Sequence, residues 1–227
     1  MRIFLLAFAC LLFFSGSFAQ QLSQVSFLNG LNLTHFSVRT DQDVLIRISD
    51  DGKILEWGTE MLAKQGNYYA PKLQPFLART DYYDAYADSA FRGNVKSIGT
   101  AYISYYGNYD EDHKRGKIKS IGSLLFDYSS RHDEKTLQGK LKFVGNLTLE
   151  YYRPYEHESI RGKLKSIGST LITYYTPFDD KYNSGKLKSI GPVPYKWYSP
   201  INNIYNRGGL LTNNYRQLVG GVLYVLR

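Results

Sequence analysis

The chain has 227 residues, a formal net charge of +8, a sequence pI near 9.3 and a single cysteine, Cys10. One cysteine excludes a disulfide-stabilised fold, and four scattered histidines without cysteine partners argue against a zinc site. The basic charge favours anionic partners, and the length suffices for the core of one domain or two small ones.

Residues 1–19 are predicted to be a secretory signal peptide that is cleaved after Ala19. Arg2 precedes an apolar run from Ile3 to Phe14, and small residues follow at the cleavage site. The run falls short of the about 20 apolar residues that span a bilayer. A lipoprotein signal would need Cys10 as the acylated residue, but the apolar run continues beyond it. We therefore expect a secreted, periplasmic or cell-surface protein that is not integral to the membrane.

Residues 20–91 are predicted to form an amino-terminal β-rich capping region. Val44 to Ile48 are largely apolar around Arg47, and Asp51-Gly52 is a turn signal that leads into a distant copy of the repeat core, Lys53 to Gly58. The segment Ala63 to Arg79 contains two prolines and is expected to be irregular.

Residues 92–206 are predicted to be five repeats of 23 residues. Glycines recur at 93, 116, 139, 162, 185 and 208, and a second glycine follows each of the first five after six residues. The stretch between the two glycines reads V-K-S-I, I-K-S-I, L-K-F-V, L-K-S-I and L-K-S-I. An aromatic column keeps the same phase at Tyr82, Tyr105, Tyr128, Tyr151, Tyr174 and Trp197, and the residue after each is tyrosine except at Ser129.

Each repeat is expected to form one β-hairpin around its second glycine, because Gly followed by a small polar residue suits a type II′ turn. In the second repeat this turn places Ile121 opposite Leu124, Lys119 opposite Phe126, and Ile118 opposite Asp127 on the other face. Neither face is then wholly apolar. The pattern predicts an all-β, elongated antiparallel meander of hairpins in a single layer, with atypical capping segments at both ends.

The lysine columns favour a meander over a parallel solenoid. Stacked lysines on adjacent strands about 4.8 Å apart would repel by roughly 0.9 kcal/mol at the dielectric constant of water. In a meander the equivalent lysines lie two strands apart, about 9.6 Å, which exceeds the Debye length of about 8 Å. Asn94 is the single exception to lysine in these columns.

With its G-K start, second glycine and aromatic lead into a loop, the repeat resembles MORN-type repeats, which form meanders of β-hairpins. The chain departs from that family where Ser120, Phe143 or Ser166 replaces an extra glycine and where the Y-x-G start is missing. The chain is also similar to uncharacterised secreted repeat proteins of Bacteroidetes-type bacteria, whose signals often end in F-A-Q. The first resemblance implies a lipid-surface or scaffold module.

Residues 207–227 are expected to be carboxy-terminal capping strands. Pro192 and Pro194 fall where the last hairpin should begin its second strand, so the regular sheet should be disturbed there. The continuous apolar run from Gly221 to Leu226 predicts a buried strand.

No motif predicts catalysis, a cofactor or a resident metal. An acidic column at Asp110, Asp133, Glu156 and Asp179 follows Tyr109, His132, Tyr155 and Phe178. These loops lack the D-x-D-x-D-G order of a calcium loop, so solvated carboxylates that offset nearby cations are the preferred interpretation, with calcium binding as the alternative.

The function predicted from sequence is that of a non-enzymatic secreted or cell-envelope repeat protein. Its expected partners are an anionic glycan or lipid surface, or an envelope protein, and not nucleic acid. The alternatives are a structural or assembly module and, more remotely, a hydrolase. The predicted binding face consists of the repeating lysines and tyrosines: Lys96, Lys117, Lys119, Lys140, Lys142, Lys163, Lys165, Tyr105, Tyr128, Tyr151 and Tyr174.

Overall fold

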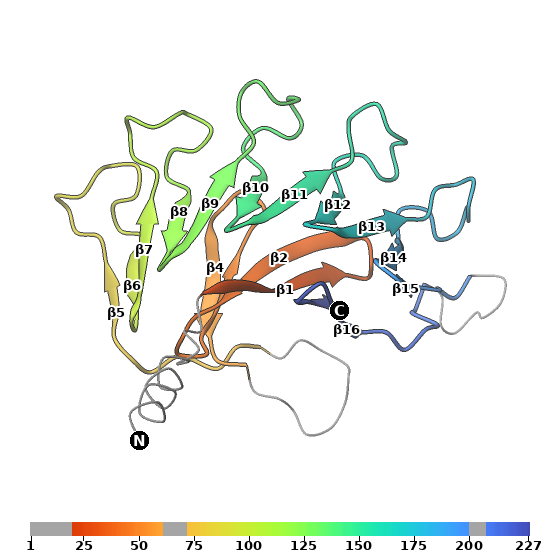
Figure 1. Cartoon of the computed structure of the whole chain (residues 1–227), viewed down its shortest axis with the longest axis horizontal. Coiled ribbons are helices and arrows are strands. Elements are labelled where there is room, and N and C mark those ends of the chain that lie inside the picture. The colour runs from red at the N-terminus through yellow and green to blue at the C-terminus, as the bar shows by residue number, and fades with distance from the viewer. Residues whose placement is uncertain (1–19, 61–71, 200–207) are drawn as a thin grey trace, which may run out of the picture.

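The computed structural model describes residues 20–60, 72–199 and 208–227, which form seventeen β-strands in two sheets (Figure 1). These residues contain no helix, so the predicted all-β class is confirmed. Among them, no helix is long and apolar enough to cross a membrane. The predicted signal peptide lies outside the described residues.

The larger sheet has eleven strands in sequential order from β5 to β15, which confirms the predicted meander. Its strands fan out around one side of the molecule, and their connecting loops project from a single outer rim (Figure 1). The strands are β5 (Thr80–Tyr82), β6 (Val95–Ile98), β7 (Ala101–Tyr105), β8 (Ile118–Ile121), β9 (Leu124–Tyr128), β10 (Leu141–Val144), β11 (Leu147–Tyr151), β12 (Leu164–Ile167), β13 (Thr170–Tyr174), β14 (Leu187–Ile190) and β15 (Val193–Pro194).

The predicted two-residue turns join the strands of each hairpin. Gly122 has a φ of +54°, and Ser123, which follows it, stays at negative φ, as a type II′ turn requires. Ile121 then pairs with Leu124, and Ser120 with Leu125, as the sequence predicts. The corresponding glycines of the other four repeats have φ between +52° and +58°.

A β-bulge at the second lysine of each repeat overturns the predicted alternation further along the strand. Ile118 pairs with Tyr105 and Ser120 pairs with Ser104, so Lys119 is an extra residue without a partner. The prediction that Ile118 and Ile121 lie on opposite faces is therefore wrong, and both are fully buried. The same irregularity recurs at Lys96, Lys142, Lys165 and Lys188.

The smaller sheet combines the amino-terminal strands with the carboxy-terminal ones in the order β16-β17-β1-β2-β3-β4. Strand β17 lies between β16 and β1, runs parallel to β1 and is largely buried, which confirms the buried strand predicted for residues 221–226. The strands are β1 (Gln21–Leu28), β2 (Asn32–Arg39), β3 (Leu45–Ile48), β4 (Ile54–Gly58), β16 (Arg216–Val219) and β17 (Val222–Leu226).

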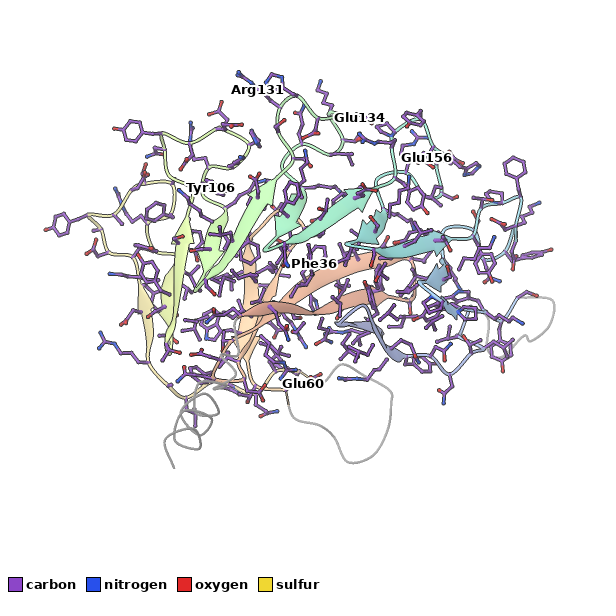
Figure 2. The ribbon with its side chains drawn as sticks, viewed as in Figure 1. Phe36, Glu60, Tyr106, Arg131, Glu134 and Glu156 are labelled. Carbon is purple, nitrogen blue, oxygen red and sulfur yellow. The ribbon has the colours of Figure 1, made fainter. Side chains whose placement is uncertain are left out.

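The two sheets share one hydrophobic core, so the expected single layer is wrong. Val25, Phe36 and Ile46 of the smaller sheet belong to the same buried cluster as Ile103 and Phe126 of the larger one. Phe36 lies between the two sheets in Figure 2. The physical reason is the bulge, which turns both aliphatic residues of each I-K-S-I stretch to the same side and gives the meander an apolar inner face.

Two further sequence expectations concern the ends of the array. The edge strand β15 has two residues and contains Pro194. The regular sheet therefore ends at the position predicted from Pro192 and Pro194. Residues 72–79 have no strand, apart from one bridge between Gln74 and Thr59, and the remainder of the predicted irregular segment lies partly outside the described residues.

Replacing Phe36 with alanine should lower the free energy of unfolding by roughly 3–5 kcal/mol, because it leaves a cavity between the sheets. Leu125→Ala is the matched control, because this residue lies on the open face of the larger sheet and is 63% exposed. Its replacement should cost below about 0.5 kcal/mol. Denaturant titration followed by tryptophan fluorescence measures both, and equal small losses would contradict a shared core.

Candidate binding surface

The first lysine of repeats two to five joins its own hairpin to the next loop through an aromatic ring and a glycine carbonyl, and we call this arrangement the fastener. In the second repeat, the Lys117 ammonium lies 5.0 Å from the centre of the Tyr128 ring and donates a hydrogen bond to the Gly139 carbonyl in the next loop. Lys140, Lys163 and Lys186 repeat this arrangement, with ring distances of 4.7 to 5.1 Å and Nζ–O distances of 2.6 to 3.1 Å. These ammonium groups are therefore engaged within the fold.

The first aromatic column of the repeats is buried from Tyr105 to Tyr174. Tyr105, Tyr128, Tyr151 and Tyr174 are at most 8% exposed, and each hydroxyl donates to the backbone carbonyl ten residues earlier at 2.8 to 3.0 Å. Burial raises the pKa of all four hydroxyls. The rings of Tyr128, Tyr151 and Tyr174 each lie beneath the first lysine of their own repeat, so these three cannot form the predicted binding face. Among the described residues, no lysine is placed over the Tyr105 ring, which lines a cleft between the sheets.

The second tyrosine of each pair takes the place that sequence reasoning gave to the first. Tyr83, Tyr106 and Tyr175 are only partly buried, whereas Tyr152 is buried. Each of the four hydroxyls donates to a carbonyl of the next repeat at 2.9 to 3.0 Å. The bulge lysines lie over these rings at 5.4 to 5.8 Å: Lys96, Lys119, Lys165 and Lys188. Period-two alternation places the two tyrosines of a pair on opposite faces, but the bulge decides which of the two is buried.

The acidic column supports the loops and neutralises the bulge lysines. Asp133 accepts a hydrogen bond from the Ser130 backbone N–H at 2.7 Å, and its carboxylate is 3.4 Å from Lys142 Nζ. Asp179 repeats both contacts with Thr176 and Lys188, which lower its pKa to about 2. Within the described part of the chain, no ion pair joins Lys96 or Lys119 to a carboxylate, so these two carry the least compensated charge of the column.

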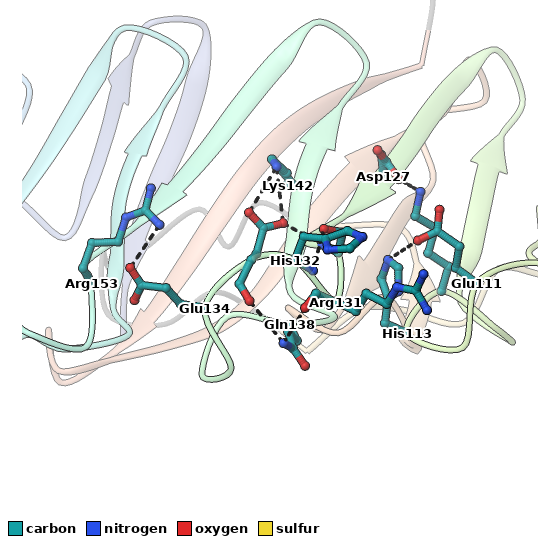
Figure 3. A network of polar contacts seen from close by, with 12 residues as sticks. Glu111, His113, Asp127, Arg131, His132, Glu134, Gln138, Lys142 and Arg153 are labelled. Carbon is teal, nitrogen blue, oxygen red and sulfur yellow. Dashed lines mark hydrogen bonds and ion pairs between the residues drawn. The ribbon is translucent and has the colours of Figure 1, made fainter.

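Figure 3 shows the polar contacts around the second and third loops of the array, residues 107–115 and 130–138. Glu111 lies 3.2 Å from His113, and Gln138 donates hydrogen bonds to the carbonyls of Arg131 and Asp133. An open groove of about 760 Å³ runs between the two loops and includes Tyr109 in its lining. Across residues 20–60, 72–199 and 208–227, no group of three or more His, Cys, Asp or Glu side chains is placed to hold a metal ion.

A row of exposed aromatic side chains marks the outer rim. Tyr86, Tyr109, Tyr155 and Phe178 are each at least 82% exposed, and the exposed His132 occupies the equivalent position of the third loop. All five stand 23 residues apart, and the last four come just before the acidic column. The sequence therefore contained this signal, but sequence reasoning used it only to locate the acidic residues.

The rim loops are closed at their base by the same pair of backbone hydrogen bonds. In the second loop, the Tyr106 N–H donates to Lys117 O and the Gly116 N–H donates to Tyr106 O, both at 2.9 Å. Equivalent pairs close the other four loops. The loops are thus compact structures that hold each aromatic residue at a defined place.

The chain matches no protein-family model, no curated protein and no solved structure. The resemblance to MORN-type repeats therefore stays a prediction, and the function has to be argued from the geometry of the rim and the sheet.

Lys163 should make stability depend on pH. Its ammonium is half-buried and burial lowers its pKa to about 8, from 10.5. Below pH 8 the burial penalty is fully present, whereas between about pH 8 and 10 only the unfolded state holds the proton, so the free energy of unfolding rises with pH. Lys163→Met should lack this rise in denaturant titrations at about pH 7 and about pH 9.5.

Tyrosine ionisation affects the wild type and Lys163→Met alike and cancels in their comparison. Lys163 Nζ also donates to the carbonyls of Leu31 and Gly185 at 2.7 and 2.6 Å, and these contacts favour the charged amine. An identical pH dependence of the two proteins would show that these hydrogen bonds outweigh burial.

Proposed function

We propose that this chain is a non-enzymatic exported protein that binds an extended partner through the row of aromatic side chains on its outer rim. The observation that carries the proposal is the near-complete exposure of Tyr86, Tyr109, Tyr155 and Phe178 at equivalent positions of successive loops. Aromatic residues dominate the energetics of binding surfaces, and none of these four contributes to the core.

The geometry of the array favours a partner that is long rather than compact. Equivalent positions lie two strands apart, about 9.6 Å, and the loop tips diverge further because the strands fan out (Figure 1). A partner that contacts all of the loops must therefore follow the rim. Repetition also supports a non-enzymatic role, because each type of side chain is presented several times rather than once.

The rim is not basic. Residues 84–92, 107–115, 130–138, 153–161 and 176–184 together carry eleven Asp or Glu and eight Lys or Arg. The positive charge of the chain is instead concentrated in the strands, where most lysines already have partners. Attraction to an anionic surface therefore gives little support to binding at the rim.

Lys96 and Lys119 support a second candidate function, which is contact with an anionic glycan or lipid surface. They lie over Tyr83 and Tyr106 at 5.8 and 5.4 Å, and no carboxylate of the described residues is paired with them. Two free cations at one end of the open sheet face would give weak binding that falls with added salt.

Replacing Tyr86, Tyr109, Tyr155 and Phe178 together with serine should reduce co-sedimentation of the mature protein with the insoluble cell-surface fraction by at least about tenfold. The matched control replaces two exposed residues of the sheet face with serine: Leu125 and Leu171. Both variants should keep the wild-type unfolding midpoint, because neither change touches the core.

Unchanged retention of the rim variant would refute binding at the rim. If retention instead falls with salt and in Lys96→Gln/Lys119→Gln, the second candidate is the correct one.

A further inference from the structure

The first repeat lacks one part of the fastener that the next four repeats share. In those repeats a lysine ammonium sits between an aromatic ring and a glycine carbonyl. Asn94 takes the place of that lysine in the first repeat, while the ring of Tyr105 and the glycine at position 116 are kept. The receiving groups for an ammonium are present without the side chain that supplies it.

A cleft of about 400 Å³ opens at this position. Asn94, Tyr105 and Gly116 line it from the larger sheet, and Trp57 of β4 lines it from the smaller one. Tyr82 completes the lining and is 55% exposed, because it lies on the edge strand β5 and has no preceding repeat to cover it. A smaller cleft of about 270 Å³ lies beside the filled positions of Lys140 and Lys163. The shorter side chain of Asn94 therefore enlarges an opening between the sheets, because a lysine here would extend to the Gly116 carbonyl as its equivalents do.

The chemistry of the cleft suits a cation that can also donate hydrogen bonds. Three aromatic side chains, Trp57, Tyr82 and Tyr105, surround the space, and aromatic rings attract ammonium groups through their negative faces. Across the described residues, no side chain is recorded as donating to the Gly116 carbonyl, whereas the equivalent Gly139 carbonyl accepts a hydrogen bond from Lys117. The contacts expected for a bound ammonium are those that Lys117, Lys140, Lys163 and Lys186 make in repeats two to five.

We propose that this cleft binds a primary alkylammonium group, as carried by a lysine side chain, in the position that the lysine of the other repeats occupies. The site does not include the rim aromatics. It lies near the β5 edge of the larger sheet, at the opposite end of the hairpin array from β15. A ligand ammonium donates to the Gly116 carbonyl and rests on the Tyr105 ring, and its alkyl chain packs against Trp57.

Lys53 is the cationic group that lines the same cleft, and it opposes a second positive charge. Its Nζ lies 2.9 Å from Asp51 Oδ2, and its side chain is 73% exposed, so it points toward its own carboxylate partner at the edge of the site. Lys53→Gln should therefore tighten ligand binding, whereas a site for anions would lose affinity on the same change.

The direct test is a titration of the mature protein with Nα-acetyl-lysine N-methylamide, followed by tryptophan fluorescence. Trp57 lines the cleft, whereas Trp197, the other tryptophan, is buried beneath Lys186. The uncharged norleucine analogue should bind at least about tenfold more weakly, since it lacks the cation–π and charged hydrogen-bond contacts. The trimethyl-lysine analogue should also bind more weakly, because it cannot donate to the Gly116 carbonyl. Equal binding of the norleucine analogue would overturn the proposal.

Asn94→Lys is the second test, because it supplies the missing ammonium from the chain itself. The variant should lose binding of the lysine analogue while its unfolding midpoint stays the same or rises. Undiminished binding by a folded Asn94→Lys protein would refute the assigned position. If the variant does not fold, the comparison of the three analogues on the wild-type protein decides the question. The rim variant should bind the lysine analogue as the wild type does, which separates this site from the proposed function.

Discussion

The lysine ammonium held between a tyrosine ring and a glycine carbonyl is the contact on which the repeat array depends. It ties three places together: the start of one hairpin, the end of that hairpin and the closing glycine of the next loop. A buried ammonium is tolerated because the carbonyl accepts one of its protons and the ring supplies electrostatic attraction. The constant spacing within each hairpin follows, since an insertion between the lysine and its tyrosine would separate the ammonium from the ring.

The bulge beside this lysine determines how the array meets the rest of the chain. Without the extra residue at Lys119, Ile118 and Ile121 would point to opposite faces, and neither face could exclude water. With it, each repeat turns its aliphatic residues and its first tyrosine inward. The smaller sheet then covers a continuous apolar surface, and Gly52 lies so close to the Tyr128 hydroxyl that a side chain there would collide with it. The sandwich is therefore a consequence of one local irregularity repeated five times.

The features of the fold that depend on local chemistry could be predicted from the sequence. The turn glycines, the hairpins, the meander and the buried terminal strand all follow from periodicity and from the need for positive φ. The bulge could not be predicted, because nothing within the V-K-S-I or I-K-S-I stretch distinguishes an extra residue from a paired one. The bulge moves the following residues of the strand to the opposite face, and it places Tyr105, Tyr128, Tyr151 and Tyr174 inside. The parallel pairing of β1 with β17 joins the two ends of the chain and has no local signal.

The columns of the repeat divide according to what the fold requires of them. The glycines, first lysines and first tyrosines are nearly invariant among the repeats because each fits a fixed internal contact. The rim position varies from Tyr to His to Phe, yet it stays aromatic where no contact within the core demands an aromatic ring. At Asn94 the opposite holds. The Tyr105 ring and the Gly116 carbonyl are present, but the lysine that contacts the equivalent groups in the other repeats is missing. Packing within the fold accounts for neither the exposed rings nor the open cleft, and both binding proposals rest on these two features.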